Sequence, residues 1–420
     1  MALQTIQQQH IQEGKWEGSV DELRGLVSER AITGETMLLN MGPHHPSTHG
    51  VLRLLLELDG EEIITCLPDI GFLHTGIEKN IESKTYEKGV TLTDRIDYLS
   101  PLSNNMAFCL AVEKLVDLDV PPRAQAVRVL LLELQRIASH LVWLGTHAMD
   151  LGAMSVFLYC FREREHILDL LEIVSGQRLM GSYFRPGGLW RDLPPDFLPA
   201  LEQFIAYFPP KVDDYEALLT KNPLWKDRTQ GIGVVEPEVA LAHGMTGPTL
   251  RGSGVNWDIR KAIPYSGYEQ YDFNIPLGEH GDVYDRYIIR VHEMRESLKI
   301  VKQAAASLPG GPFRTQNRKF APPPRSELGQ SMEAVIHHFK LWTEGFSAPD
   351  EEVYVSIESP RGEFGCYLHG TGGNKPRRCH FKTPSFMHIS ALPVMARGHM
   401  IADLVGIAGS IDVVLGDCDR

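Results

Sequence analysis

The sequence predicts an α+β protein in which a central helical bundle carries small antiparallel β-sheets at its periphery. Residues 123–149 and 152–174 are long and apolar on nearly all sides, which is typical of helices in the middle of a bundle. Short apolar runs bounded by turn residues, one group near each end of the chain, predict the sheets. No repeat or flexible linker divides the chain, so we expect residues 34–420 to form a single domain.

The first sheet is expected close to the N-terminus. Residues 1–33 are polar and rich in glutamine, and we expect an extension that packs on a neighbouring chain. Residues 37–39 and 51–58 predict strands, because apolar and β-branched residues dominate them. Asp59 and Gly60 then predict a hairpin turn into a third strand at residues 63–67.

Helical periodicity begins at about residue 76. A helix that includes residues 106–115 is expected to stop before Pro121 and Pro122, and the helix at 152–174 is expected to end at Gly176. Further helices are expected at residues 196–208, 211–220, 283–307, 326–342 and 391–405. Residues 244–278 are rich in glycine and tyrosine and predict an ordered, irregular loop, whereas residues 353–357 and 365–369 predict a late hairpin.

Composition and charge exclude several classes of protein. Hydrophobic residues make up 43% and charged residues 23% of the chain, as in a globular protein with a substantial core. The formal net charge of −13 argues against a nucleic-acid partner and against attachment by anionic lipid alone. No signal-peptide pattern is present, and His147 and Asp150 interrupt the most apolar stretch, residues 141–161, which favours a core helix over a membrane span.

Cysteine spacing and glycine motifs limit the cofactors that this chain can hold. No C-x-x-C motif occurs, so patterns for iron–sulfur clusters and structural zinc are absent, and six scattered cysteines suit buried thiols in the reducing cytoplasm. The chain also lacks G-x-G-x-x-G after a strand, G-x-x-x-x-G-K-[ST] and G-x-S-x-G. Nucleotide chemistry is therefore expected on another chain.

The segment G-P-H-H-P-S-T-H-G, residues 42–50, is the most unusual in the sequence. Its prolines prevent a regular helix, so His45 and His49 cannot form a metal-binding pair on a helix face. A rigid turn of this kind can hold an imidazole in one orientation, which proton donation requires. Two alternatives stay open: a hairpin whose histidines, His44 included, bond only to backbone, and a zinc or nickel site.

Tyr98 and Asp150 are the other polar residues in unexpected positions. Tyr98 stands in D-R-I-D-Y-L-S, where an apolar helix begins. Asp150 lies in an apolar stretch of about 20 residues, where an unpaired carboxylate is costly to bury. Asp150 is therefore a helix cap, an acceptor for a buried partner or a functional carboxylate, and nothing in the local sequence brings it close to His49 or Tyr98.

Long motifs carry a family resemblance. They are M-G-P-H-H-P-S-T-H-G-V-L-R-L from Met41, G-F-L-H-T-G-I-E-K from Gly71, L-A-V-E-K-L from Leu110, F-R-E-R-E from Phe161, G-S-G-V-N-W-D-I-R-K from Gly252, S-M-E-A-V-I-H-H-F-K from Ser331 and the final D-C-D-R. From about Glu35 to Arg420 the chain resembles the D subunits of the bacterial NADH–quinone oxidoreductases, respiratory complex I. Cys418 is a small departure from the pattern.

That family is itself similar to the large subunit of nickel–iron hydrogenases, so the resemblance implies a hydrogenase-like fold without the metal site. The positions of the four metal-binding cysteines fall on Asp97, Ser100, Val414 and Asp417, which cannot replace soft thiolates. The segment E-S-P-R-G from Glu358 resembles a hydrogenase turn. The resemblance thus implies that the former metal cavity has become room for a quinone.

The resemblance also implies a role for the three residues singled out above. The quinone head group is expected between His49 and Tyr98, and Asp150 is expected to be the partner of His49. Reduction of a quinone to a quinol consumes two electrons and two protons. Imidazolium, with a pKa of roughly 6.5, and phenol, with a pKa of roughly 10, can both donate to the reduced ring. Asp150 would orient His49 and favour its charged form.

Partners follow from the same resemblance. The electrons are expected from a [4Fe–4S] cluster on the adjacent B subunit, with the C and I subunits of the peripheral arm and the membrane-embedded H subunit as further neighbours. The chain would then lie on the cytoplasmic side of the bacterial inner membrane. The rivals are a working hydrogenase, a structural scaffold, and the equivalent subunit of an oxidoreductase fed by ferredoxin.

Overall fold

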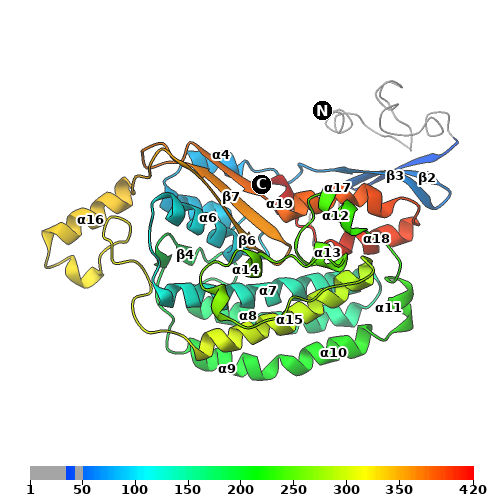
Figure 1. Ribbon diagram of the computed structural model, residues 1–420, viewed down its shortest axis with the longest axis horizontal. Coiled ribbons are helices and arrows are strands. Elements are labelled where there is room, and N and C mark those ends of the chain that lie inside the picture. The colour runs from blue at the N-terminus through cyan, green and yellow to red at the C-terminus, as the bar shows by residue number, and fades with distance from the viewer. Residues whose placement is uncertain (1–34, 43–50) are drawn as a thin grey trace.

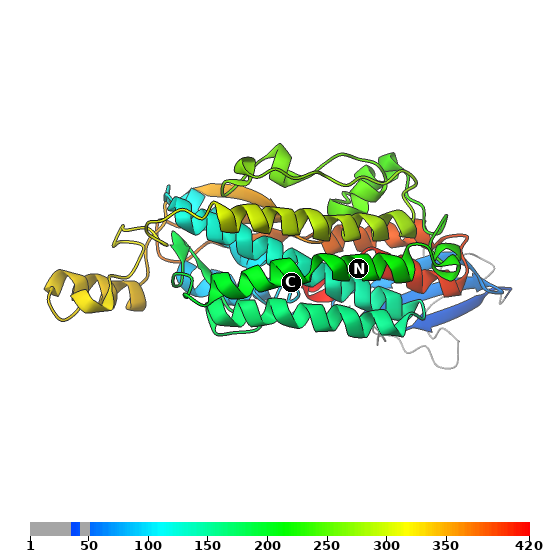
Figure 2. The same ribbon diagram turned by 90° about the horizontal axis from the view of Figure 1, so that it is seen from below.

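A computed structural model describes residues 35–42 and 51–420 of the chain. A bundle of helices whose axes are nearly aligned forms its body (Figures 1 and 2). The three longest helices are α7 (Pro122–Asp150), α8 (Met154–Ser175) and α15 (Val283–Ala306), and the shorter α9 (Phe197–Tyr207) and α10 (Pro209–Leu219) pack beside them. Residues of α7 are buried on every side over most of its length, as expected for a central helix. The predicted α+β class and these helices are confirmed.

Local sequence explains where the central helices begin and end. Pro122 opens α7, where a missing backbone N–H costs nothing. Gly152, with φ of +94°, lies in the short connection to α8, and Gly176, with φ of +80°, ends α8 as predicted. The two helices therefore run antiparallel through a very short turn.

Two antiparallel sheets lie on the bundle, and a two-stranded pair stands apart from them. The first sheet has the order β1 (Met37–Met41), β2 (Arg53–Asp59), β3 (Glu62–Asp69), with the predicted turn at Gly60. The second has the order β6 (Glu352–Glu358), β7 (Glu363–His369), β8 (Arg378–Lys382). The late hairpin is confirmed, but the sequence did not predict β8 or the short pair β4 (Phe184–Arg185) and β5 (Gly188–Leu189).

The prediction of one last helix at residues 391–405 is wrong. Helix α17 (Pro384–Ala396) ends before this stretch is half complete, and α18 (Ile401–Ser410) starts anew. Between them the backbone joins β3, because Ile63 donates to the His399 carbonyl at 2.9 Å and Gly398 donates to the Ile63 carbonyl at 2.8 Å. Gly398, with φ of +77°, makes this break possible.

The prediction of a wholly irregular loop at residues 244–278 is also wrong in part. This stretch contains α13 (Gly247–Gly252), α14 (Ile259–Ala262) and the 3₁₀ turn η1 (Tyr268–Gln270). The remaining elements are α4 (Ile77–Glu82), α5 (Tyr86–Thr93), α6 (Pro101–Leu115), α11 (Pro223–Asp227), α12 (Pro237–Ala242), η2 (Arg325–Glu327), α16 (Met332–Thr343) and α19 (Leu415–Asp419). Helix α16 projects from one end of the molecule (Figures 1 and 2).

Buried apolar side chains form two clusters, one inside the helical bundle and one under β1–β3, α17 and α18. All six cysteines are buried and free, as expected. Across residues 35–42 and 51–420, no helix is long and apolar enough to cross a membrane. The extension predicted at residues 1–33 lies outside the described residues, and the single domain at 34–420 stays a prediction.

Candidate functional site around the C-terminal segment

Tyr98 lies in the bend between α5 and α6, and hydrogen bonds hold this bend in place. The carbonyl of Asp97 accepts from the Asn104 amide at 3.0 Å and from the Ser100 backbone at 3.1 Å. On the other side, the Gln135 amide of α7 donates to the Leu99 carbonyl at 3.0 Å. The bend is thereby anchored to both α6 and the central helix of the bundle.

The ring of Tyr98 packs against Gly416 in α19. A Cβ atom at Gly416 would lie 3.2 Å from Cε1 of Tyr98 and 2.6 Å from the Ile96 carbonyl oxygen, so only glycine allows this approach. Burial raises the pKa of Tyr98, with Arg361 opposing and Asp97 adding to the rise. The hydroxyl therefore stays protonated near neutral pH, which a hydrogen-bond or proton donor requires.

A buried arginine network lies beside Tyr98. The Arg361 guanidinium donates to Oδ2 of Asp97 at 2.5 Å, to the Asp412 carbonyl at 2.9 Å and to Oδ1 of Asp412 at 3.3 Å. It also reaches the Ser139 hydroxyl of α7 at 3.3 Å. Burial raises the pKa of Asp97, although the charge of Arg361 works in the opposite direction. Arg361 thus joins the Tyr98 bend, α7 and the C-terminal segment.

Asp417 is fully buried and has few polar partners. Its Oδ2 accepts from the Ser385 backbone at 3.1 Å, whereas its Oδ1 has no hydrogen-bond partner among the described residues. Burial and the negative charge of Asp97 raise the pKa of Asp417 to about 7. A carboxyl of this kind can hold or release a proton near neutral pH.

The predictions for His44, His45 and His49 concern residues outside the described part of the chain, but the flanking residues Gly42 and Leu52 are described. A Cβ at Gly42 would lie 2.3 Å from the Leu52 carbonyl oxygen, and Gly42 has φ of +103°, so the backbone just after β1 closely approaches the backbone just before β2. Leu52 lines a small cavity together with Ile411, Val413 and Leu415. Leu52, just before β2, therefore lies near the residues that lead to Gly416 and Tyr98.

Asp150 is the last residue of α7 and is half buried. It is not a helix cap, because Leu151 takes the C-cap position of α7 and Ala153 the N-cap position of α8. The next residue, Leu151, lies 3.4 Å from where a Cβ at Gly406 of α18 would stand. Ala408, two residues further along α18, lines the same cavity as Leu52. Helix α18 therefore lies between Asp150 and that cavity.

Tyr98 and Asp150 do not share a hydrogen bond. The Tyr98 bend contacts the middle of α7, whereas Asp150 is its last residue. The Tyr98 bend contacts α7 at Gln135, fifteen residues before Asp150. At 1.5 Å per residue this separation is roughly 22 Å along the helix. The structure thus brings Tyr98 against Gly416 of α19, whereas Leu151, the residue after Asp150, lies beside Gly406 of α18.

The comparisons with known proteins agree with this picture of the fold. A family model described as "Respiratory-chain NADH dehydrogenase, 49 Kd subunit" matches residues 150–420. The second D subunit of the NADH-quinone oxidoreductase of Chloroflexus aurantiacus is 62% identical over 399 residues, covering 94% of this chain and 97% of the relative. The D subunit of the Thermus thermophilus enzyme is 53% identical over 391 residues, covering 93% and 96%. The chain belongs to the family of NADH-quinone oxidoreductase D subunits. It is therefore a subunit of an oxidoreductase complex, complex I.

Three of the four residues expected at the positions of the hydrogenase thiolates form hydrogen bonds or an ion pair within this chain. Asp97 is paired with Arg361, the Ser100 hydroxyl shares a 2.7 Å hydrogen bond with the Ser103 hydroxyl, and Asp417 accepts from the Ser385 backbone. Within residues 35–42 and 51–420, no cluster of three or more histidine, cysteine or acidic side chains is arranged to hold a metal ion. Hard carboxylates and a hydroxyl also fit nickel poorly.

The ion pairs of Arg361 with Asp97 and Asp412 were not predicted from the sequence. Arg361 is separated by 264 positions from Asp97 and by 51 from Asp412. The only signal was the E-S-P-R-G turn, which contains Arg361 and was noted for its resemblance and not for its charge.

Proposed function

We propose that this chain forms, together with the B subunit, the site where quinone is reduced to quinol in complex I. One observation carries the proposal: Leu52, three residues after His49, lines one cavity with Val413 and Leu415, and the adjacent Gly416 packs against Tyr98. The two proposed donors therefore come from segments that meet at one place. The family names of the relatives, which contain "NADH-quinone oxidoreductase", support quinone as the substrate.

The chemistry assigned to this chain is proton donation and orientation. Quinone takes up two electrons and two protons, so each carbonyl oxygen needs a donor. Tyr98 supplies a protonated phenol whose pKa is raised by burial. His49 supplies an imidazolium to the other oxygen, and Asp150 orients that ring and favours its charged form. A change in the partner of Asp150 on quinone reduction would start the coupling to proton translocation.

The electrons enter from outside this chain in this proposal. A [4Fe–4S] cluster on the B subunit supplies them, and the C, I and H subunits are the further neighbours. Association through the H subunit holds the chain on the cytoplasmic side of the inner membrane. The same arrangement would serve an oxidoreductase fed by ferredoxin, which differs in its input module.

The rival is a scaffold subunit without chemistry of its own, and two substitutions separate the possibilities. In the assembled complex, His49→Ala and Tyr98→Phe should each lower quinone reduction by roughly a hundredfold, the usual loss for an acid–base group. Tyr159→Phe, on the exposed side of α8, is the matched control and should leave turnover unchanged. Normal turnover with both variants, in a complex of normal composition, would exclude the proposed quinone site and favour a scaffold role for this subunit.

Asp150→Asn tests the coupling step. The amide keeps the shape of the side chain but removes the charge that favours a charged His49. Quinone reduction and proton translocation should both fall while the subunit composition stays unchanged. If the variant reduces quinone and pumps protons at the rates of the unchanged complex, Asp150 has no part in coupling.

A further inference from the structure

Helix α16 exposes an apolar face that nothing in the described chain covers. Ser331 accepts from the Ala334 backbone at 3.3 Å and fixes the start of this helix. The face consists of Met332, Val335, Ile336, Phe339 and Trp342, whose exposed fractions run from 45% to 81%. Their spacing places them on one side of the helix. Isolated apolar residues at a surface are ordinary, whereas a continuous row of five marks an interaction surface.

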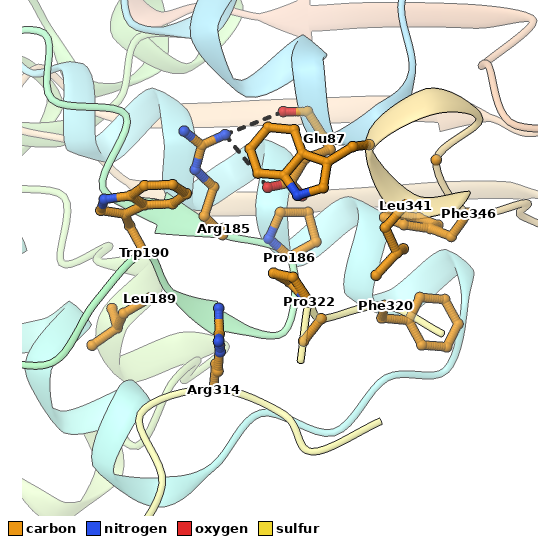
Figure 3. A pocket seen from close by; sticks show the side chains of 13 residues that line it. Glu87, Arg185, Pro186, Leu189, Trp190, Arg314, Phe320, Pro322, Leu341 and Phe346 are labelled. Carbon is orange, nitrogen blue, oxygen red and sulfur yellow. Dashed lines mark hydrogen bonds and ion pairs between the residues drawn. The ribbon is translucent and has the colours of Figure 1, made fainter. Parts of the chain in front are cut away.

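A pocket continues this apolar face into the body of the molecule (Figure 3). It has an empty volume of about 630 Å³, and Trp342 belongs both to the α16 face and to its lining. Trp190 and Arg185 lie on one side of the pocket, and Leu341, Phe346 and Phe320 lie on the other. A side chain that enters here would leave water for mostly apolar walls.

The charges in the pocket do not balance. Arg185 pairs with Glu87 at 3.5 Å, and its guanidinium stacks over the Trp190 ring at 5.5 Å. Arg314 also lines the pocket, and within the described part of the chain no carboxylate lies within 4.0 Å of it. Burial lowers the pKa of Arg314, with only the more distant Glu87 acting against this. The pocket therefore has one guanidinium more than it has carboxylates, and an incoming carboxylate would correct this.

Two occupants from this chain fit the surface poorly. A second copy would bring the same guanidinium-rich pocket, and none of the five face residues is a carboxylate. Residues 1–34 join the structure at β1, whereas α16 projects from the opposite end of the molecule (Figure 1). The chain is a subunit of a larger complex, so other protein subunits are available to cover this surface.

We propose that the α16 face and the adjoining pocket form the docking surface for another protein subunit of the complex, which lays an apolar segment along α16 and places a carboxylate against Arg314. The apolar row supplies the contact area, and Trp342 connects the row to the pocket. Arg314 selects the segment by its charge. This surface lies away from the C-terminal segment and does not depend on the quinone chemistry proposed above.

Photo-crosslinking in the intact complex tests the proposal. A photoreactive amino acid at Ile336 should form a covalent adduct with a different subunit, and sequencing of the adduct should find an aspartate or glutamate among apolar residues. Phe339→Ser and Arg314→Glu should each lower the amount of that subunit retained in the purified complex by about tenfold or more. Leu224→Ser and Lys221→Glu, both exposed near α11 at the other end of the bundle, are the matched controls and should retain it.

The other outcomes overturn the proposal. An adduct with a second copy of this chain would make the surface a homodimer contact, and an adduct with residues 1–34 of the same chain would make it an internal contact. Full retention of every subunit in both variants, without any adduct, would show that solvent covers the face. If the adduct forms but the captured segment has no carboxylate, and Arg314→Glu binds normally, the role of Arg314 is refuted.

Discussion

The pH dependence of Asp417→Asn is the sharpest test of the buried carboxyl beside Tyr98. Asp417 is fully buried, its Oδ1 has no hydrogen-bond partner among the described residues, and burial together with Asp97 raises its pKa from 3.8 to about 7. The amide has nearly the same shape but cannot ionise. The substitution therefore removes the cost of charging this site and little else.

The size and sign of the effect follow from linkage. Below pH 3.8 the carboxyl is protonated in both the folded and unfolded chain, so ionisation costs nothing. As the pH rises toward about 7, the unfolded chain releases a proton that the folded chain retains, and stability falls. The shift of about three pH units corresponds to ~4 kcal/mol. Asp417→Asn should thus gain up to about 4 kcal/mol relative to the unchanged chain between pH 4 and pH 8.

Two measurements check this expectation. Infrared difference spectra of the unchanged chain against the variant should contain a protonated carboxyl band at pH 5 that disappears as the pH passes about 7. Urea unfolding at several pH values should give the stability difference. Asp196→Asn, at an exposed position before α9, is the matched control and should not change the pH profile. An ionised Asp417 at pH 5, or a variant with the same pH dependence as the unchanged chain, would refute the reasoning.

Three further predictions concern neighbouring contacts. Gly416→Ala places a methyl group 3.2 Å from the Tyr98 ring and should lower quinone turnover about tenfold in a complex that still assembles, measured beside Gly310→Ala as an exposed control. Arg128→Lys breaks the two hydrogen bonds that Arg128 donates to Glu113, at 3.0 and 2.5 Å, and should lower the free energy of unfolding by about 3 kcal/mol; an unchanged urea midpoint would contradict this. Burial lowers the pKa of His388 to about 4, so stability should be lost as the pH falls from 6.5 toward 4, by up to about 3 kcal/mol, and His388→Gln should abolish this loss.

Sequence reasoning predicted those parts of the fold that depend on local pattern. The apolar periodicity of α7 and α8 and the stop at Gly176 come from residues close together in the chain, and the structure confirms them. The break between α17 and α18 depends instead on pairing with Ile63, more than 300 positions away. Apolar residues end at Ala396 and resume at Met400, and an interruption of only three residues does not by itself divide a helical pattern into two.

In the candidate site too, local sequence predicted individual residues but not the contacts between residues far apart in the chain. The local sequence drew attention to Tyr98 and Asp150 as polar residues in apolar surroundings. It also allowed Asp150 to be a helix cap, and the structure rules this role out. The position of Tyr98 against Gly416 joins residues 318 positions apart, and no local pattern contains it. Only the family resemblance pointed to the C-terminal segment, and it did so through the old thiolate positions.

Charge counting explains why one carboxyl in this segment keeps a proton. Asp97, Asp412 and Asp417 are buried together, and the guanidinium of Arg361 already donates to the first two. Burial raises the pKa of Asp417, and a third negative charge here would also repel Asp97 where screening by solvent is weak. The exchange of metal-binding thiolates for carboxylates would therefore leave a protonated group beside Tyr98, at the point where the proposed chemistry needs protons. Replacing Arg361 by methionine should raise the pKa of Asp97 further, because the ion pair between the two side chains would be lost.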